Sequence, residues 1–164
     1  MKIDEQISQL LLQEECGSRR KLTLILVVGD GPRNHIEHGL SSESGKLSSV
    51  AAVAASRADV DVLFLSKLQY LFMYLMKFEA EEALTAIRYN YFVIYGLDQG
   101  ILSAATTGEQ SLGDRLRVAN LICNAAFRIK RKHGLLDVRL IPWDDQSDTA
   151  ERLARIERYW RHIC

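Results

Sequence analysis

The chain has 164 residues and carries 21 lysines and arginines against 21 aspartates and glutamates, while 48% of its residues are hydrophobic. This length suits one compact domain over residues 1–164, and the balanced charge excludes a uniformly basic nucleic-acid-binding protein but not a local basic patch. The three cysteines are too few and too scattered for a disulfide framework or a zinc cluster, and the polar start of the sequence is not a signal peptide. We therefore expect a soluble, intracellular protein that does not contact a membrane.

Hydrophobic periodicity and turn residues divide the sequence into alternating helices and strands. In the first half we predict a helix within residues 1–17, a strand over 22–28, a polar loop over 30–45, a helix over 46–57, a strand over 60–65 and a helix over 67–87. In the second half we predict a strand over 91–95, a loop over 100–110, a helix over 112–132 that Gly134 closes, a strand over 138–141 and a helix within 148–164, capped by Ser147 or Asp148.

The alternation of strands and helices predicts an α/β fold with three layers and a mainly parallel sheet. The run over residues 22–28, Leu-Thr-Leu-Ile-Leu-Val-Val, is almost entirely apolar, which is typical of a strand buried on both faces. In such sheets ligands bind beyond the carboxyl ends of the strands. The residues at those ends, among them Gly29, Gly96 and Asp98, are therefore the first place to look for a site.

Residues 43–48, Glu-Ser-Gly-Lys-Leu-Ser, lead into a helix rich in small residues and look like the end of a phosphate-binding loop. The working motif has a glycine, four further residues, a Gly-Lys pair and then a Ser or Thr that binds Mg²⁺. Leu40 stands in place of the first glycine and Leu47 in place of the hydroxyl residue. A chance pairing of Gly45 and Lys46 at a helix start explains the sequence better than a working loop, although a decayed phosphate loop is an attractive alternative.

Two histidines in the polar segment, His35 and His38, lie near Asp30 and Glu37 and have the chemistry of metal ligands. The spacing indicates no third ligand, and histidines in a polar loop are more often simply solvated. We therefore expect no metal site.

Aspartates also follow the predicted strands, at Asp30, Asp98, Asp144 and Asp145. A Mg²⁺-dependent nuclease or phosphotransferase needs carboxylates in such places. Aspartates are equally common in turns and helix caps, which explains Asp144 and Asp145 adequately and is the interpretation we favour.

The end of the predicted helix over 112–132 is strongly basic, and its cations are the candidate nucleic-acid contacts. Cations at a helix C-terminus complement the helix dipole, but this end carries more of them than that effect requires. A basic patch in an otherwise neutral protein suits contacts with a phosphate backbone. The candidate DNA-binding residues are Arg128, Lys130, Arg131, Lys132 and, just beyond the helix, Arg139.

The predicted helix over 67–87 has apolar residues around nearly its whole circumference, more than one face of a sheet can cover. A fully internal helix is the alternative, but a domain of this size rarely encloses one. We therefore predict that Tyr70, Phe72, Tyr74 and Phe78 contribute to the interface with a protein partner.

Four segments resemble the ATPase core of the RecA-type recombinases, and especially their small, diverged paralogs in Shu-type complexes. They are residues 62–66 (Val-Leu-Phe-Leu-Ser), 91–97 (Tyr-Phe-Val-Ile-Tyr-Gly-Leu), 119–128 (Ala-Asn-Leu-Ile-Cys-Asn-Ala-Ala-Phe-Arg) and 156–160 (Ile-Glu-Arg-Tyr-Trp). The resemblance covers most of the chain after Lys21 and lies in the order of the elements rather than in one strict motif.

The resemblance implies a RecA-like core whose nucleotide site is degenerate. Tyr95 stands where active members of the family place the aspartate that coordinates Mg²⁺, and the phosphate loop around Gly45 and Lys46 lacks two of its residues. It therefore implies a subunit without ATP hydrolysis and without a cofactor. Such a subunit would pair with another recombinase paralog, contact single-stranded or forked DNA, and assist homologous recombination in the nucleus of a eukaryote.

Two other functions stay open at this point. The first is a P-loop nucleotide-binding ATPase, with Lys46 on the phosphates and Asp98 on Mg²⁺. The second is a Rossmann-like enzyme or binding protein for a small ligand, which would use Asp30, His35 and His38.

Overall fold

The computed structural model describes residues 3, 23–39, 60–82, 87–103 and 111–164. Its elements follow one another in the order β1 (Thr23–Val28), α2 (Asp30–Asn34), the π-helical turn η2 (His35–Gly39), β2 (Val60–Leu65), α5 (Leu68–Ala80), β3 (Tyr91–Tyr95), α6 (Leu97–Ser103), α7 (Leu112–His133), β4 (Asp137–Ile141) and α8 (Asp148–Ile163). In this part of the chain no helix is long and apolar enough to cross a membrane.

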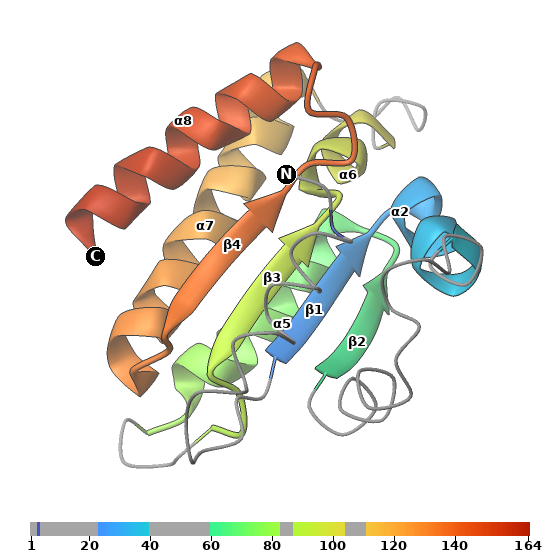
Figure 1. Ribbon diagram of the computed structural model, residues 1–164. Helices are drawn as coiled ribbons and strands as arrows, with labels where there is room; N and C mark the ends of the chain where they lie inside the picture. The colour runs from blue at the N-terminus through green and yellow to red at the C-terminus, as the bar shows by residue number, and fades with distance from the viewer. Residues whose placement is uncertain (1–2, 4–22, 40–59, 83–86, 104–110) are drawn as a thin grey trace.

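The four strands form one parallel sheet in the order β2-β1-β3-β4 (Figure 1). Leu26 of β1 pairs with Leu63 of β2 on one side and with Ile94 of β3 on the other. Because all strands run the same way, their carboxyl ends share one edge of the sheet. The predicted α/β class with a parallel sheet is confirmed, and the arrangement is consistent with a three-layer fold.

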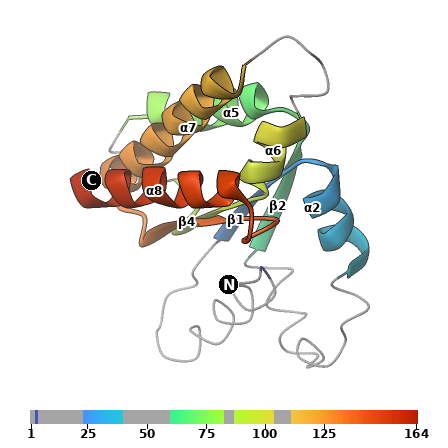
Figure 2. The same ribbon diagram turned by 90° about the horizontal axis from the view of Figure 1, so that it is seen from above.

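One face of the sheet packs against the long helices, and Figure 2 shows α5 and α7 together on that side. Leu24, Leu26 and Val28 alternate along β1 and face this core, since side chains in a strand point to opposite faces in turn. Phe92 on β3 and Phe127 on α7 are its largest fully buried side chains.

The opposite face of the sheet has its own buried cluster. Ile25 and Val27 of β1 lie in it, together with Val93 of β3, Ile141 of β4 and Ile3. All six residues of β1 are buried. The prediction that the first strand is buried on both faces is therefore confirmed.

The segment after β1 differs from its prediction, because helix replaces the first part of the expected polar loop. The α-helix begins at Asp30, directly after the strand, and passes into the π-helical turn at His35. Pro32 is buried in the first turn, where its fixed φ is compatible with a helix and its missing N–H removes no helical bond. Gly31 and Pro32, which were predicted to lie in a loop, therefore belong to the start of a helix.

The segment after β3 also differs, because the expected loop from Gly100 is helical as far as Ser103. A Cβ at Gly100 would lie 2.6 Å from Cγ1 of Val28 and 2.9 Å from Cδ2 of Leu68. Gly100 thus permits α6 to pack closely on β1, which is a tertiary requirement that a local pattern does not reveal.

The helix predicted over 67–87 is shorter than expected and ends at Ala80, since Glu81 has extended backbone angles. The other described helix ends agree well with their predictions. The αL conformation of Gly134 closes α7, and Ser147 caps α8 by accepting the backbone N–H of Ala150. The helices predicted within 1–17 and over 46–57 lie outside the described residues.

Candidate functional site

The strand order places the topological switch point of the sheet between β1 and β3, where ligands bind in open α/β sheets. Here α2 packs directly onto the carboxyl end of β3. A Cβ at Gly96 would lie 2.3 Å from Cγ of Pro32, and a Cβ at Gly31 would lie 2.7 Å from Oε1 of Gln99. Protein atoms therefore occupy this part of the edge.

Asp98, one of the predicted nucleotide-site residues, lies beside this edge in the first turn of α6 and is only 1% exposed. Its Oδ1 accepts the backbone N–H of Trp143 at 2.8 Å, and its Oδ2 accepts that of Asp144 at 3.0 Å. Both carboxylate oxygens thus hold the turn between β4 and α8. These two hydrogen bonds give Asp98 a structural role at the carboxyl edge.

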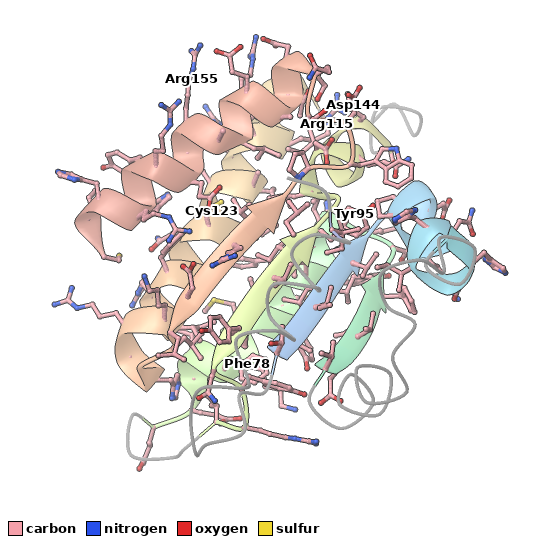
Figure 3. The ribbon with its side chains drawn as sticks, in the orientation of Figure 1. Phe78, Tyr95, Arg115, Cys123, Asp144 and Arg155 are labelled. Carbon is pink, nitrogen blue, oxygen red and sulfur yellow. The ribbon has the colours of Figure 1, made fainter. Side chains whose placement is uncertain are left out.

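Tyr95, at the carboxyl end of β3, is 4% exposed and belongs to an aromatic cluster (Figure 3). Its ring lies 6.3 Å from the ring of His35 and 6.1 Å from that of Trp143, and the latter two are 6.0 Å apart.

The second candidate metal ligand, His38, is exposed. Among the described residues no group of three or more His, Cys, Asp or Glu side chains could hold a metal ion. Gly45 and Lys46 lie outside the described residues.

The basic end of α7 lies against the C-terminal end of α5, and two of its side chains contact the last carbonyls of α5. Nζ of Lys132 donates to the carbonyl of Glu79 at 2.5 Å, and Nε2 of His133 lies 2.9 Å from the carbonyl of Phe78. The last carbonyls of a helix lack partners within it, so these bonds cap α5. This role was missed from the sequence, because nothing local relates residues more than fifty positions apart.

Two arginines of this cluster line an open hollow of about 500 Å³ together with Lys132. The lining residues of the hollow are Glu79, Arg128, Arg131, Lys132 and Cys164. Arg128 forms an ion pair with Glu79 at 2.9 Å, although its own side chain is 61% exposed. Arg131 is exposed, and no ion pair ties it to another described residue. The hollow therefore presents guanidinium groups to solvent.

Two of the predicted DNA-binding residues lie apart from this hollow. Nζ of Lys130 lies 5.9 Å from the centre of the Phe127 ring. Arg139 is half-buried on β4, where its Nε pairs with Oδ2 of Asp137 at 3.0 Å. The structure thus gathers Arg128, Arg131 and Lys132 but not the other two.

The outer face of α5 exposes three side chains that follow one another at helical spacing. Tyr70 is 49% exposed, Met73 68% and Met76 38%. Of the other residues predicted at a partner interface, Phe72 and Tyr74 are half-buried and Phe78 lies in the core. The two methionines were missed, although a spacing of three residues opposite the buried leucines was the signal that would have found them.

The model of the family described as Suppressor of HU sensitivity involved in recombination protein 1 matches residues 4–164. The chain belongs to this family. It is also 29% identical over 164 residues to the protein of that name from Saccharomyces cerevisiae (strain ATCC 204508 / S288c), with 99% of each chain covered. This confirms the resemblance to Shu-type subunits and supports a role in recombination.

For a member of the Suppressor of HU sensitivity family, two described surfaces have the chemistry of contact sites. The hollow at the ends of α5 and α7 is basic, with Arg131 at its rim. The outer face of α5 is apolar around Met73. Neither surface includes Asp98 or Tyr95, the two described residues of the candidate nucleotide site.

Proposed function

We propose that this chain is a non-catalytic subunit of a recombination complex, which contacts the phosphate backbone of DNA through the hollow and pairs with a second recombinase-paralog subunit through the outer face of α5. The observation that carries the DNA contact is the grouping of Arg128, Arg131 and Lys132 around one open space. A role in recombination fits a nuclear location in a eukaryote.

Charge and geometry support phosphate as the ligand of the hollow. Its one lining residue with a carboxylate side chain, Glu79, is already paired with Arg128. Arg131 projects its guanidinium without such a partner among the described residues, and guanidinium groups bind phosphate oxygens in a bidentate manner. Contacts of this kind position a protein on DNA without reading the bases.

Two residues of the carboxyl edge support a subunit that does not hydrolyse nucleotides. Both oxygens of Asp98 accept backbone N–H groups. The resemblance expects a metal-binding aspartate at Tyr95, and the ring of this tyrosine lies 6.1 Å from that of Trp143.

The exposed face of α5 supports a protein partner. Aromatic residues and methionine are enriched at the centres of protein interfaces, while lysine and glutamate are depleted there. Tyr70, Met73 and Met76 form such a face. The flexible methionine side chains adapt to the shape of a partner surface.

The DNA contact is tested by the substitution Arg131→Gln, with Arg117→Gln as the matched control. Both arginines are exposed on α7, and they lie about 21 Å apart along the helix axis. Binding of a fluorescent single-stranded oligonucleotide is measured by anisotropy over a series of salt concentrations. We expect wild-type binding to weaken steeply with salt, and Arg131→Gln to weaken binding several-fold and lower the salt slope by about 0.7.

Arg117→Gln should leave both the affinity and the slope unchanged. Equal effects of the two substitutions would show that the hollow is not the DNA site. No salt-dependent binding by the wild-type chain, alone or with candidate paralog subunits, would overturn the DNA contact itself.

The partner interface is tested by Met73→Glu in co-purification with purified recombination paralogs from the same organism. A charge at the centre of an apolar interface should reduce recovery of the partner at least tenfold, with DNA binding by the chain alone unchanged. Leu136→Glu is the control, since it places the same charge on an exposed apolar residue outside α5, between α7 and β4. Undiminished recovery with Met73→Glu would reject this face as the interface.

A further inference from the structure

We propose that the outer face of α8 near its end extends the hollow into a site for single-stranded nucleic acid, with the ring of Tyr159 as a stacking platform for one base. This inference rests on the proposed DNA contact and specifies the form of the ligand. It requires that the ring be exposed and fixed, that cations surround it, and that it lie within reach of the hollow.

The ring of Tyr159 is exposed and held in place. Its exposed fraction is 58%, the highest among the aromatic residues of the described part of the chain. It stands edge-on to the ring of Trp160, with centroids 5.1 Å apart and an interplanar angle of 82°. Nε1 of Trp160 in turn donates to Oδ1 of Asn120 on α7 at 2.8 Å. A ring fixed in this way loses little conformational entropy when a base stacks on it.

Donor side chains surround Tyr159 on the helix surface. Arg155, Arg158 and His162 lie four residues before it, one before it and three after it, and all three are exposed. Figure 3 shows Arg155 pointing away from the body of the protein. Arg155 pairs with Glu151 within the helix, but both partners are more than 60% exposed. Such a pair contributes little to stability, so its guanidinium is available to a phosphate.

The platform is near the hollow, around the end of α8. Cys164, which follows the last residue of α8, lines the hollow together with Arg128 and Arg131 of α7. Tyr159 lies five positions before Cys164, which is about 7.5 Å along the helix axis and about 140° around it. A strand whose phosphates lie in the hollow therefore has to pass around the end of α8 to bring a base to the ring.

This combination favours a single nucleic-acid strand over a duplex. Aromatic platforms beside a basic groove are the common means of binding single strands, because every base has a face that stacks. A duplex keeps its bases stacked on one another and offers none to the ring. Tyrosine and arginine are also enriched at protein interfaces, so a protein partner is the contrary outcome of the test.

The test compares Tyr159→Ala and Tyr159→Phe with the wild-type chain by anisotropy, using three fluorescent probes: oligothymidine, an abasic single strand of the same length, and a duplex. We expect Tyr159→Ala to weaken binding of oligothymidine by about 5- to 150-fold, which corresponds to the 1–3 kcal/mol of one stacked base. Tyr159→Phe keeps the ring and should bind like wild type.

Binding of the abasic strand and of the duplex should be unchanged in both variants, and the salt slope for oligothymidine should not change because no charge is removed. Equal losses on all three probes would mean that the ring supports the fold rather than a base, and would overturn the inference. Unchanged binding of oligothymidine would also overturn it and leave the ring to a protein partner. In either case the loss caused by Arg131→Gln would still uphold the proposed DNA contact, so the two failures are distinguishable.

Discussion

Asp98 accepts the backbone N–H of Trp143 at 2.8 Å across 45 residues of chain, which fixes the end of the last strand to the start of α6. The second oxygen accepts the N–H of Asp144, so one carboxylate orders the whole turn that leads into α8. The same residue type at the same sheet edge would bind Mg²⁺ in an enzyme if it faced solvent. Burial and these two hydrogen bonds thus give Asp98 a structural role.

The first prediction concerns this carboxylate. Asp98→Ala leaves two backbone N–H groups without acceptors, and we expect it to lower the free energy of unfolding by about 2–4 kcal/mol. Asp98→Asn keeps one acceptor and should cost about half as much. Urea denaturation monitored by circular dichroism measures both. Asp145→Ala, at an exposed position of the same turn, is the control and should stay within about 0.5 kcal/mol of wild type. Equal stability of all variants would contradict the structural role of Asp98.

The second prediction concerns two glycines with positive φ but different surroundings. Gly96 has φ 81°, and a Cβ there would lie 2.3 Å from Cγ of Pro32 and 2.5 Å from the carbonyl of Val28. Gly134 has φ 66° and open space around it. We expect Gly134→Ala to cost about 1 kcal/mol, from backbone conformation alone, and Gly96→Ala to cost more than about 4 kcal/mol. Thermal unfolding of both variants compares them.

A variant with Gly96→Ala that does not fold is still informative. Adding Pro32→Gly removes the nearest clash and should restore part of the stability, whereas the carbonyl of Val28 keeps the rest of the strain in place. Equal costs at Gly96 and Gly134 would show that α2 does not pack on the sheet edge as described.

The strands were the most predictable part of this fold, for a physical reason. A parallel strand buried on both faces needs a continuous apolar run, and β1 and β3 carry such runs with few polar interruptions. The end of helix α7 was equally predictable, because Gly134 and the basic residues before it are local signals of a helix C-terminus.

The errors arose where tertiary contacts override local preference. Helix follows β1 because Pro32 packs on Gly96, and Gly100 is helical because α6 approaches β1 closely. Helix α5 ends at Ala80, with its last carbonyls bonded to Lys132 and His133. None of these relationships has a signal within one stretch of sequence.

In the candidate site, too, features with a local sequence signal were predictable and features set by tertiary contacts were not. Composition alone located the basic cluster, since Arg128 and Arg131 stand out in a neutral chain. Which of these basic residues cap α5 and which only face solvent could be decided only once the position of α5 was known. The sequence marked Tyr159 only as part of the resemblance over residues 156–160, because the exposure of its ring becomes known only from the structure.

The third prediction concerns the reactivity of two cysteines. Cys123 is fully buried on α7, and burial, with the nearby charge of Glu157 adding to it, raises the pKa of its thiol to about 12. At pH 8 its thiolate fraction is therefore on the order of 10⁻⁴, and thiolate is the reactive form. Cys164 is half-buried at the rim of the hollow.

We expect iodoacetamide to alkylate Cys164 at least about 100-fold faster than Cys123 in the folded chain. Peptide mapping by mass spectrometry after timed labelling measures the two rates separately. In denaturant the rates should become similar, which controls for intrinsic differences between the two peptides. Similar rates without denaturant would place Cys123 outside the core.

The last prediction concerns the pairing of Asp137 with Arg161, which joins α8 to the start of β4. Nη1 of Arg161 lies 2.7 Å from Oδ1 of Asp137, and Nε of Arg139 lies 3.0 Å from Oδ2. Burial by itself would raise the pKa of Asp137, but the hydrogen bonds from Arg161 and Arg139, the charge of Arg161 and the N–H of Val138 outweigh it and lower the pKa.

Because the pKa of Asp137 is lower in the folded chain than in the unfolded chain, the ionised form stabilises the fold above the unfolded pKa of about 4. That contribution is lost as the pH falls through the lower, folded value. Asp137→Asn should therefore reduce the free energy of unfolding by about 2 kcal/mol at pH 7, and by progressively less below pH ~4. Urea denaturation over a pH series measures the difference.

Glu37→Gln is the matched control for this experiment, since Glu37 pairs with Arg33 at 3.1 Å on an exposed surface. We expect that substitution to change the free energy of unfolding by less than about 1 kcal/mol at every pH. A deficit in Asp137→Asn that persists unchanged at low pH would mean that the substitution acts through packing rather than through the charge. A deficit that shrinks with acid identifies the carboxylate as the group that fixes α8, and with it the position of Tyr159 beside the hollow.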